Sequence, residues 1–226
     1  MNLTEIACGR PKRDISGQYT SMNIASGAFA IVLVVARLLF KRFLTGSGQI
    51  GLDDWVILAA IVIAVPGIVA NQIGLVGHGI GKDIWTLPAS ELPMFAMYFF
   101  IMELFYIVEM SLVKLSLSLF YLHVFPGPKI RWLLIGTAIF NAVFGIVFLI
   151  ATLAQCIPLD FAWTQYYDHP PEGQCFDINR FAWANAGLSL MTDVWMLILP
   201  LVQIRKLNLH WKRKVGVATM FILGAL

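Results

Sequence analysis

Five apolar stretches of this 226-residue chain are each long enough to cross a lipid bilayer. The hydrocarbon core of a bilayer is about 30 Å thick and an α-helix rises about 1.5 Å per residue, so a spanning helix needs about 20 largely apolar residues. A sixth stretch begins at Val215 and is cut off at Leu226. The pattern predicts an all-α, polytopic transmembrane bundle with an incomplete sixth helix. The predicted spans are residues 22–40, 56–76, 95–121, 132–156, 181–202 and, in part, 215–226.

Composition argues against the alternatives of a soluble helical core and a membrane β-barrel. Apolar residues make up 59% of the chain and charged residues 13%, and the mean hydropathy is +0.78, a mixture that a soluble surface could not accommodate. A barrel strand would alternate apolar and polar positions, whereas residues 28–35 are apolar on every side. The stretches are therefore predicted to be helices.

The distribution of lysine and arginine predicts the orientation, because cytoplasmic loops retain positive charge during insertion. The connections after the first, third and fifth stretches carry ten of these residues, and the opposite side carries five. We therefore expect a plasma-membrane protein with an extracellular tail over residues 1–21, although three positive residues in that tail oppose the bias. The connection 157–179 has no lysine or arginine, which fits an exterior loop. Asn2 begins a weak N-glycosylation signal on the same side.

Two of the three cysteines lie on the side predicted to be exterior. Cys156 closes the fourth stretch, and Cys175 lies near the end of the connection that follows. A disulfide between them would close a loop of about 20 residues and contribute roughly 3 kcal/mol in the chain-entropy model. We predict this pairing. The alternatives are two free thiols, or a pairing of either cysteine with Cys8.

Charged residues within the apolar stretches are costly, roughly 2.5–3.5 kcal/mol each at the centre of a lone helix, unless they are paired or face water. The third stretch contains Glu103, Glu109 and Lys114, and the fifth contains Asp193. At about 100° per residue, Glu103 and Lys114 share one face of the helix and Glu109 lies on a second. We predict an intramembrane polar network of these four residues, with Asp193 as the counter-ion of Lys114 in an ionic lock or proton-linked switch. Alternatively, Lys114 snorkels to the inner headgroups while Asp193 binds a serine or tryptophan.

Proline and glycine mark expected irregularities. Pro66 and Pro200 are expected to kink the second and fifth helices. Residues 74–83 contain four glycines. This segment is predicted to be a flexible loop that caps the outer mouth of the bundle rather than a phosphate-binding loop, because no strand precedes it.

The sequence contains no constellation typical of a soluble enzyme. Its histidines lie in separate connections or at the ends of spans, without the spacing of a metal site. We therefore predict no enzymatic activity and no metal. Basic residues beyond the fifth stretch are expected to contact anionic lipid or a cytoplasmic partner rather than nucleic acid. These residues are Arg205, Lys206, Lys212, Arg213 and Lys214.

Five segments carry a resemblance that extends from about residue 15 to residue 226. They are GLDDW at 51–55, GHGIGKDIW at 77–85, KLSLSLFY at 114–121, CIP at 156–158 with Trp163 and GQC at 173–175, and DVWMLILP at 193–200. In order and spacing they resemble the fungal rhodopsin-domain integral membrane family, which includes the Pth-type receptors. Residues 8–14 also look like the junction that follows an extracellular CFEM domain in some members, a domain that this chain lacks.

The resemblance implies a seven-helix bundle with an external N-terminus and a role as a G-protein-coupled-receptor-like sensor. Its implied partners are an unknown extracellular ligand and a heterotrimeric G protein or another cytoplasmic effector. Retinal is not implied, because its Schiff base would need a lysine in a seventh helix, so we expect no cofactor. The alternatives are a transporter or proton-linked channel with a path along the charged residues of the spans, and a structural membrane protein without a ligand.

Overall fold

The computed structural model describes residues 14–44, 51–83, 86–125, 127–167, 169 and 171–206, and the side chains of residues 40–44 and 204–206 are not part of that description. Several predictions fall elsewhere in the chain. The glycosylation signal at Asn2, the incomplete sixth span and the basic residues Lys212, Arg213 and Lys214 all lie outside the described residues.

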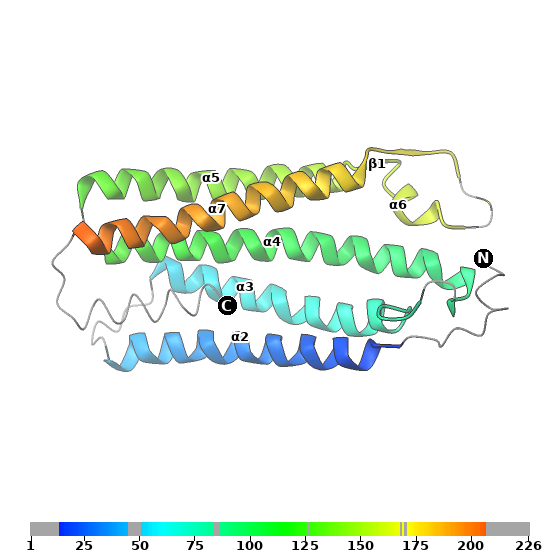
Figure 1. Cartoon of the computed structure of the whole chain (residues 1–226), viewed down its shortest axis with the longest axis horizontal. Helices are drawn as coiled ribbons and strands as arrows, with labels where there is room; N and C mark the ends of the chain where they lie inside the picture. Colours follow the sequence, from blue (N-terminus) through cyan, green and yellow to red (C-terminus); the bar gives the residue numbers. More distant parts are fainter. Residues whose placement is uncertain are drawn as a thin grey trace.

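Five long helices form the body of the described part of the molecule (Figure 1). Each is long and apolar enough to cross a membrane, with α3 continued by the π-helix η1. Their bounds are α2 (Ser16–Leu44), α3 (Leu52–Ala70), η1 (Asn71–Val76), α4 (Leu92–Val124), α5 (Pro128–Leu153) and α7 (Ile178–Lys206). Short elements lie in the connections, namely η3 (Ala89–Glu91), β1 (Cys156–Ile157), α6 (Phe161–Thr164) and β2 (Gln174–Cys175). The predicted all-α, polytopic bundle is confirmed.

Each long helix begins three to six residues before the apolar stretch from which it was predicted, and local features favour a helix start at several of these positions. Helix α2 starts at Ser16, where the Asp14 carboxylate accepts hydrogen bonds from the Ser16 backbone nitrogen (3.0 Å) and from Ser16 Oγ (2.5 Å). Helices α4 and α5 each have a proline in their first turn, where a missing backbone N–H costs no helical hydrogen bond.

A change of helix type follows Pro66, where a kink was predicted. Helix α3 runs through Pro66 and changes to the wider π-helical turn only at Asn71. In η1, the Asn71 amide and the Tyr19 hydroxyl of α2 lie within hydrogen-bonding distance, at 3.0 Å between nitrogen and oxygen. On the other side of η1, a Cβ atom at Gly74 would come within 2.2 Å of the Tyr98 ring, so only glycine permits this approach to α4.

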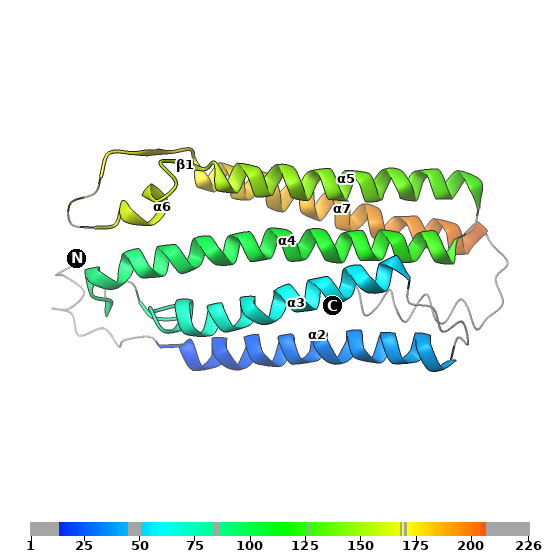
Figure 2. The same cartoon turned by 180° about the vertical axis from the view of Figure 1, so that it is seen from behind.

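Helix α4 lies in the middle of the bundle. It contacts α3 on one side and α5 on the other, and α2 packs on the far side of α3, as the two opposite views in Figure 1 and Figure 2 show. The outer faces are apolar and uncovered by the described residues, with Trp132 at 77% and Trp183 at 80% of full exposure. A surface of this kind is suited to lipid, and helices are one of the two structures that satisfy their backbone polar groups inside a bilayer. The chain is a multi-pass membrane protein.

Two clusters of buried apolar side chains lie at opposite ends of the bundle. At the end where α4 stops and α5 starts, the cluster contains Tyr121, Phe125, Leu134 and Leu199. At the other end, Phe100 packs with Cys156 and Ala162 of the connection between α5 and α7. Between these clusters, buried polar side chains of α4, α5 and α7 lie among apolar ones, and this middle layer is described below.

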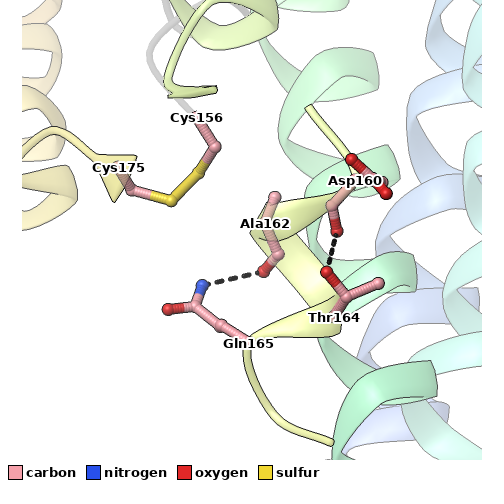
Figure 3. Close-up of a disulfide and its surroundings, with 6 residues drawn as sticks. All are labelled: Cys156, Asp160, Ala162, Thr164, Gln165 and Cys175. Carbon is pink, nitrogen blue, oxygen red and sulfur yellow. Dashed lines mark hydrogen bonds between the residues drawn. A yellow bond between two sulfur atoms is a disulfide. The ribbon is translucent and has the colours of Figure 1, made fainter. Parts of the chain in front are cut away.

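The predicted disulfide between Cys156 and Cys175 is confirmed (Figure 3). It joins β1 to β2, which pair antiparallel with these two cysteines opposite each other. Helix α6 lies beside the disulfide and is held by a 2.8 Å hydrogen bond from Thr164 Oγ1 to the Asp160 carbonyl. The disulfide therefore fixes the α5–α7 connection over the end of the bundle, which we call the disulfide end.

The glycine-rich loop that follows η1 lies at the disulfide end. Gly79 and Gly81 have positive φ angles of 117° and 82°, which favour glycine. The Gly81 carbonyl accepts a 2.9 Å hydrogen bond from the Ile15 backbone nitrogen, so the loop docks on the start of α2. A Cβ atom at Gly81 would lie 2.9 Å from the Ser16 backbone nitrogen, which leaves no room for a larger residue.

Candidate functional site

A layer of polar side chains connects α4, α5 and α7 at mid-length. We call it the polar junction and define it as Lys114 and Ser118 of α4, Asn141 of α5, and Ser189 and Asp193 of α7. A polar side chain is costly in the hydrocarbon region unless it finds a partner, so polar residues that face one another between helices form the part of a membrane bundle most specific to its function.

Lys114 is the centre of the polar junction. Its Nζ atom lies 2.7 Å from Ser189 Oγ, 3.0 Å from the Ser189 carbonyl oxygen and 3.0 Å from Asp193 Oδ1. These three partners match the three donors of an ammonium group, and all of them belong to α7. The Lys114 side chain is 7% exposed, so it is buried between the helices and does not snorkel to the membrane surface. Because Ser189 and Asp193 are four residues apart, they lie on one face of α7.

Asn141 brings α5 into the polar junction. Its Nδ2 atom lies 3.4 Å from Ser118 Oγ and 3.5 Å from Met196 Sδ, and Ser118 Oγ in turn donates a 2.9 Å bond to the Lys114 carbonyl. Asn141 is only 1% exposed, yet its Oδ1 atom has no hydrogen-bond partner among the described residues. A buried, unpaired carbonyl costs about 1–3 kcal/mol, so this position has unused capacity to accept a hydrogen bond.

A small cavity adjoins the polar junction. Its volume is about 10 Å³, close to the space that one water molecule needs. Polar groups from all three helices line it, including Ser111, Asn141 and Asn185. Close packing limits its size, because a Cβ atom at Gly145 of α5 would lie 2.1 Å from Ser111 Oγ.

The structure joins two of the four residues of the predicted intramembrane network. Lys114 and Asp193 are paired, whereas Glu103 and Glu109 are half-buried on α4 without an ion-pair or hydrogen-bond partner among the described residues. Glu103 lies eleven residues before Lys114, which is roughly 16 Å along a helix, too far for direct contact. Three residues of the polar junction were not among the predicted site residues. Two of them could have been suspected from the sequence. Asn141 is an amide inside an apolar span, and Ser189 shares a helix face with Asp193.

A second polar group lies at the end of the bundle opposite the disulfide. Arg37 Nη2 of α2 lies 3.0 Å from Asp53 Oδ2 of α3, and the Arg37 guanidinium lies 4.9 Å from the centre of the Phe120 ring of α4. Ser116 Oγ of α4 donates a 2.8 Å hydrogen bond to the Asp53 carbonyl. We call these four residues the Arg37 cluster. It joins α2, α3 and α4, whereas the polar junction joins α4, α5 and α7.

Two further groups of residues lie outside the polar junction and the Arg37 cluster. His78 is 2.5 Å from Glu91 and stacks on Tyr98 at the disulfide end, and the described residues include no group of three or more side chains that could hold a metal ion. Arg205 and Lys206 close α7, but their side chains are outside the description, as is the rest of the predicted cytoplasmic partner surface.

Comparison with known proteins identifies the family. The fungal rhodopsin domain matches residues 36–226. A SAT4 family membrane protein of Emericella nidulans is 29% identical over 150 residues, which cover 65% of this chain and 38% of that protein. Wortmanamides biosynthesis cluster protein C of Talaromyces wortmannii is 26% identical over 200 residues, which cover 85% of this chain and 53% of that protein. Receptor GIN3 of Arthrobotrys oligospora is 26% identical over 126 residues, which cover 56% of this chain and 30% of that protein.

The matched part of the chain spans about half the length of these relatives or less. No solved structure matches the chain. The match to the domain nevertheless covers α3 through α7 and every residue of the polar junction. The chain belongs to the fungal rhodopsin domain family of membrane proteins.

Proposed function

We propose that this chain is the transmembrane part of a receptor-like sensor of an extracellular cue. The disulfide end faces outward and the opposite end faces the cytoplasm. Two observations support this orientation. Disulfides persist in oxidising compartments, and the ends of α2, α4 and α7 away from the disulfide adjoin the connections richest in lysine and arginine. The name of one relative, Receptor GIN3, supports the class of function.

The observation that carries the proposal is the attachment of α7 to α4 through Lys114. The ammonium directs all three of its bonds to Ser189 and Asp193, so a shift of α7 along α4 must break or exchange them. Packed interfaces with two discrete arrangements convert a small displacement into a switch. In this mechanism the bonded arrangement is the resting state, and a ligand that binds the released arrangement more tightly shifts the population towards it.

The cue would arrive at the disulfide end, where the covalently fixed connection lies directly above α4 through the contact between Phe100 and Trp163. The readout would be at the opposite end of α7, where Arg205, Lys206, Lys212, Arg213 and Lys214 supply positive charge to a heterotrimeric G protein or another cytoplasmic effector. The proposal involves no cofactor, retinal included, and no enzymatic step.

A second candidate is a proton-linked transporter of a small molecule. Its support is the presence of Glu103 and Glu109, two half-buried carboxylates of a membrane-spanning helix that have no partner among the described residues, since such groups mark ion and proton pathways. The name of the Talaromyces relative places that protein in a biosynthesis cluster, which is compatible with transport of a small molecule.

The test uses the full-length protein in lipid nanodiscs with a heterotrimeric G protein, and measures guanine-nucleotide exchange without added ligand. Lys114→Met removes the ammonium and retains a chain of similar shape, so exchange should rise several-fold as α7 is released. Lys129→Met is the matched control, because Lys129 is exposed at the start of α5. If wild type and both variants support the same exchange, the lock does not control signalling. Proton-driven uptake in liposomes that is lost in Glu103→Gln would favour the transporter.

A further inference from the structure

A second recess, larger than the cavity of the polar junction, lies between α5 and α7. Its volume is about 440 Å³, within the range of small-molecule sites, and it shares no lining residue with that cavity. We call it the α5–α7 groove. The residues that decide its chemistry are Trp132, Gly136, Thr137 and Phe140 of α5, and Thr192 and Trp195 of α7.

The walls of the α5–α7 groove fit a flat, rigid, apolar molecule. Trp132 and Phe140 are eight residues apart on α5, which separates them by about 12 Å along the helix axis. Both rings are more than half exposed, and Trp195 presents a third ring from α7. Gly136 opens the wall between the two rings, since nothing lies within 4 Å of a Cβ atom built there. All of these residues belong to membrane-spanning helices, so the molecules that reach the groove are lipids.

The floor of the α5–α7 groove is polar, and its hydrogen-bonding capacity is one-sided. Thr192 Oγ1 donates a 2.7 Å bond to the Leu188 carbonyl. Thr137 Oγ1 donates a 2.9 Å bond to the Leu133 carbonyl and accepts a 3.2 Å bond from Trp195 Nε1. Every proton on these side chains is therefore used, and the lone pairs that remain can only accept.

A molecule that complements this floor must donate a hydrogen bond and carry no charge. Ketones, esters and phosphates offer acceptors alone, and the lining of the groove contains no charged residue. We propose that the α5–α7 groove binds a membrane sterol, with its hydroxyl group donating to Thr192 and its fused rings lying against Trp132 and Phe140. Bound sterol would hold α5 against α7 beside the Thr137–Trp195 bond. The proposal depends on membrane insertion and not on signalling.

The experiment uses the full-length protein in nanodiscs with a photoreactive, diazirine-bearing sterol, followed by peptide mapping. Labelled peptides should contain residues from 132–140 and 188–195. Ergosterol should compete with the label, whereas its analogue without the 3-hydroxyl should compete roughly three- to tenfold less well, because one net hydrogen bond is worth about 0.5–1.5 kcal/mol. Competition by both compounds to the same degree would show that the hydroxyl makes no specific contact.

Two pairs of variants separate the groove from nonspecific lipid contact. Gly136→Leu fills the groove and should abolish the labelling. Gly187→Leu should not, because that glycine of α7 also has nothing within 4 Å of an added Cβ but does not line the groove. Thr192→Val removes the acceptor and should weaken competition by ergosterol three- to tenfold. Thr152→Val makes the same change at a buried position of α5 outside the groove and should leave binding unchanged.

Three results would overturn the proposal. One is labelling that persists in Gly136→Leu. Another is labelling that a diacyl phospholipid suppresses as strongly as ergosterol does, which would make an acyl chain the occupant. The third is the absence of labelled groove peptides at sterol concentrations that saturate the nanodisc, which would show that another part of the full-length chain covers the groove.

Discussion

The Arg37 cluster and the polar junction each contain an ion pair between helices with a nitrogen-to-oxygen distance of 3.0 Å, but the two pairs differ in which partner is buried. In the Arg37 cluster both side chains are largely buried, with Arg37 at 19% and Asp53 at 5% exposure. In the polar junction, Lys114 is 7% exposed while Asp193 is 47% exposed. The acidic partner of the junction is therefore accessible from outside the described bundle, and that of the Arg37 cluster is not.

The two pairs also differ in what else holds their helices together. Arg37 and Asp53 belong to consecutive helices joined by a short connection, and the planar guanidinium also rests on Phe120. Lys114 and Asp193 are separated by 79 residues, and the ammonium finds all its partners on α7. The Arg37 cluster thus has the properties of a fixed clamp, and the polar junction those of a contact that can open. The following predictions test that contrast.

The largest effect is expected for Asp193→Ala, which leaves the buried Lys114 ammonium without a counter-charge. We expect a loss of about 3 kcal/mol in the free energy of unfolding, the low end of the range for breaking a buried pair, because Asp193 is half exposed. Thermal unfolding in nanodiscs measures it. The double variant with Lys114→Met should recover part of the loss, since it removes the stranded charge. Strictly additive losses would mean that the two side chains do not interact.

The next effect concerns the distance between α4 and α5 beside the polar junction. Gly145→Ala places a methyl group within 2.1 Å of Ser111 Oγ and should cost about 1–3 kcal/mol through overpacking. Gly136→Ala on the same helix is the matched control, because its Cβ meets nothing within 4 Å. The melting temperature should fall for the first variant and stay within experimental error for the second. Equal melting temperatures would show that α5 can move away from α4 at little cost.

These features differ in how far the sequence could predict them. The spans were predictable because bilayer thickness dictates their length. The pairing of Cys156 with Cys175 was predictable because the alternating topology places both cysteines on the same side of the membrane. Lys114 and Asp193 could be matched as opposite charges in apolar surroundings. Ser189 could not be assigned as a partner of Lys114, nor Asn141 as a partner of Ser118, since both contacts depend on how each helix is rotated about its axis. The change to a π-helix at Asn71 occurs where the chain contacts Tyr19 and Tyr98 of neighbouring helices, and no local pattern specifies such contacts.

A smaller effect is expected when the Arg37 cluster retains its charge but loses its planar group. Arg37→Lys keeps an ion pair with Asp53 and removes the stacking of the guanidinium on Phe120, at an expected cost of about 1 kcal/mol. Thermal unfolding checks the size, and Phe120→Leu should give a similar loss that does not add to that of Arg37→Lys. Guanine-nucleotide exchange should stay at the wild-type level in both variants. A rise in exchange equal to that of Lys114→Met would show that the Arg37 cluster controls signalling as the polar junction does, and is not a fixed clamp.

The smallest effect is expected at the first turn of α2, outside both polar groups. Hydrogen bonds from the Ser16 hydroxyl, and then from the Ser16 backbone nitrogen, lower the pKa of Asp14 below its ordinary value of 3.8. A carboxylate whose pKa is lower in the folded protein stabilises the fold fully when the pH is above its pKa in the unfolded chain. This contribution is lost as the pH falls from 3.8 through the lower pKa of the folded state.

Hydrogen exchange at the start of α2, corrected for the intrinsic pH dependence, should therefore lose protection only below pH 3.8. Asp14→Asn keeps an oxygen that can cap the helix but cannot titrate, so its protection should stay constant over the same range. Because Asp14 is fully exposed and lies far along the chain from Lys114 and Arg37, the substitution itself should leave protection around both ion pairs unchanged. Altered protection in the middle of α7 in Asp14→Asn would show instead that the first turn of α2 is coupled to the polar junction.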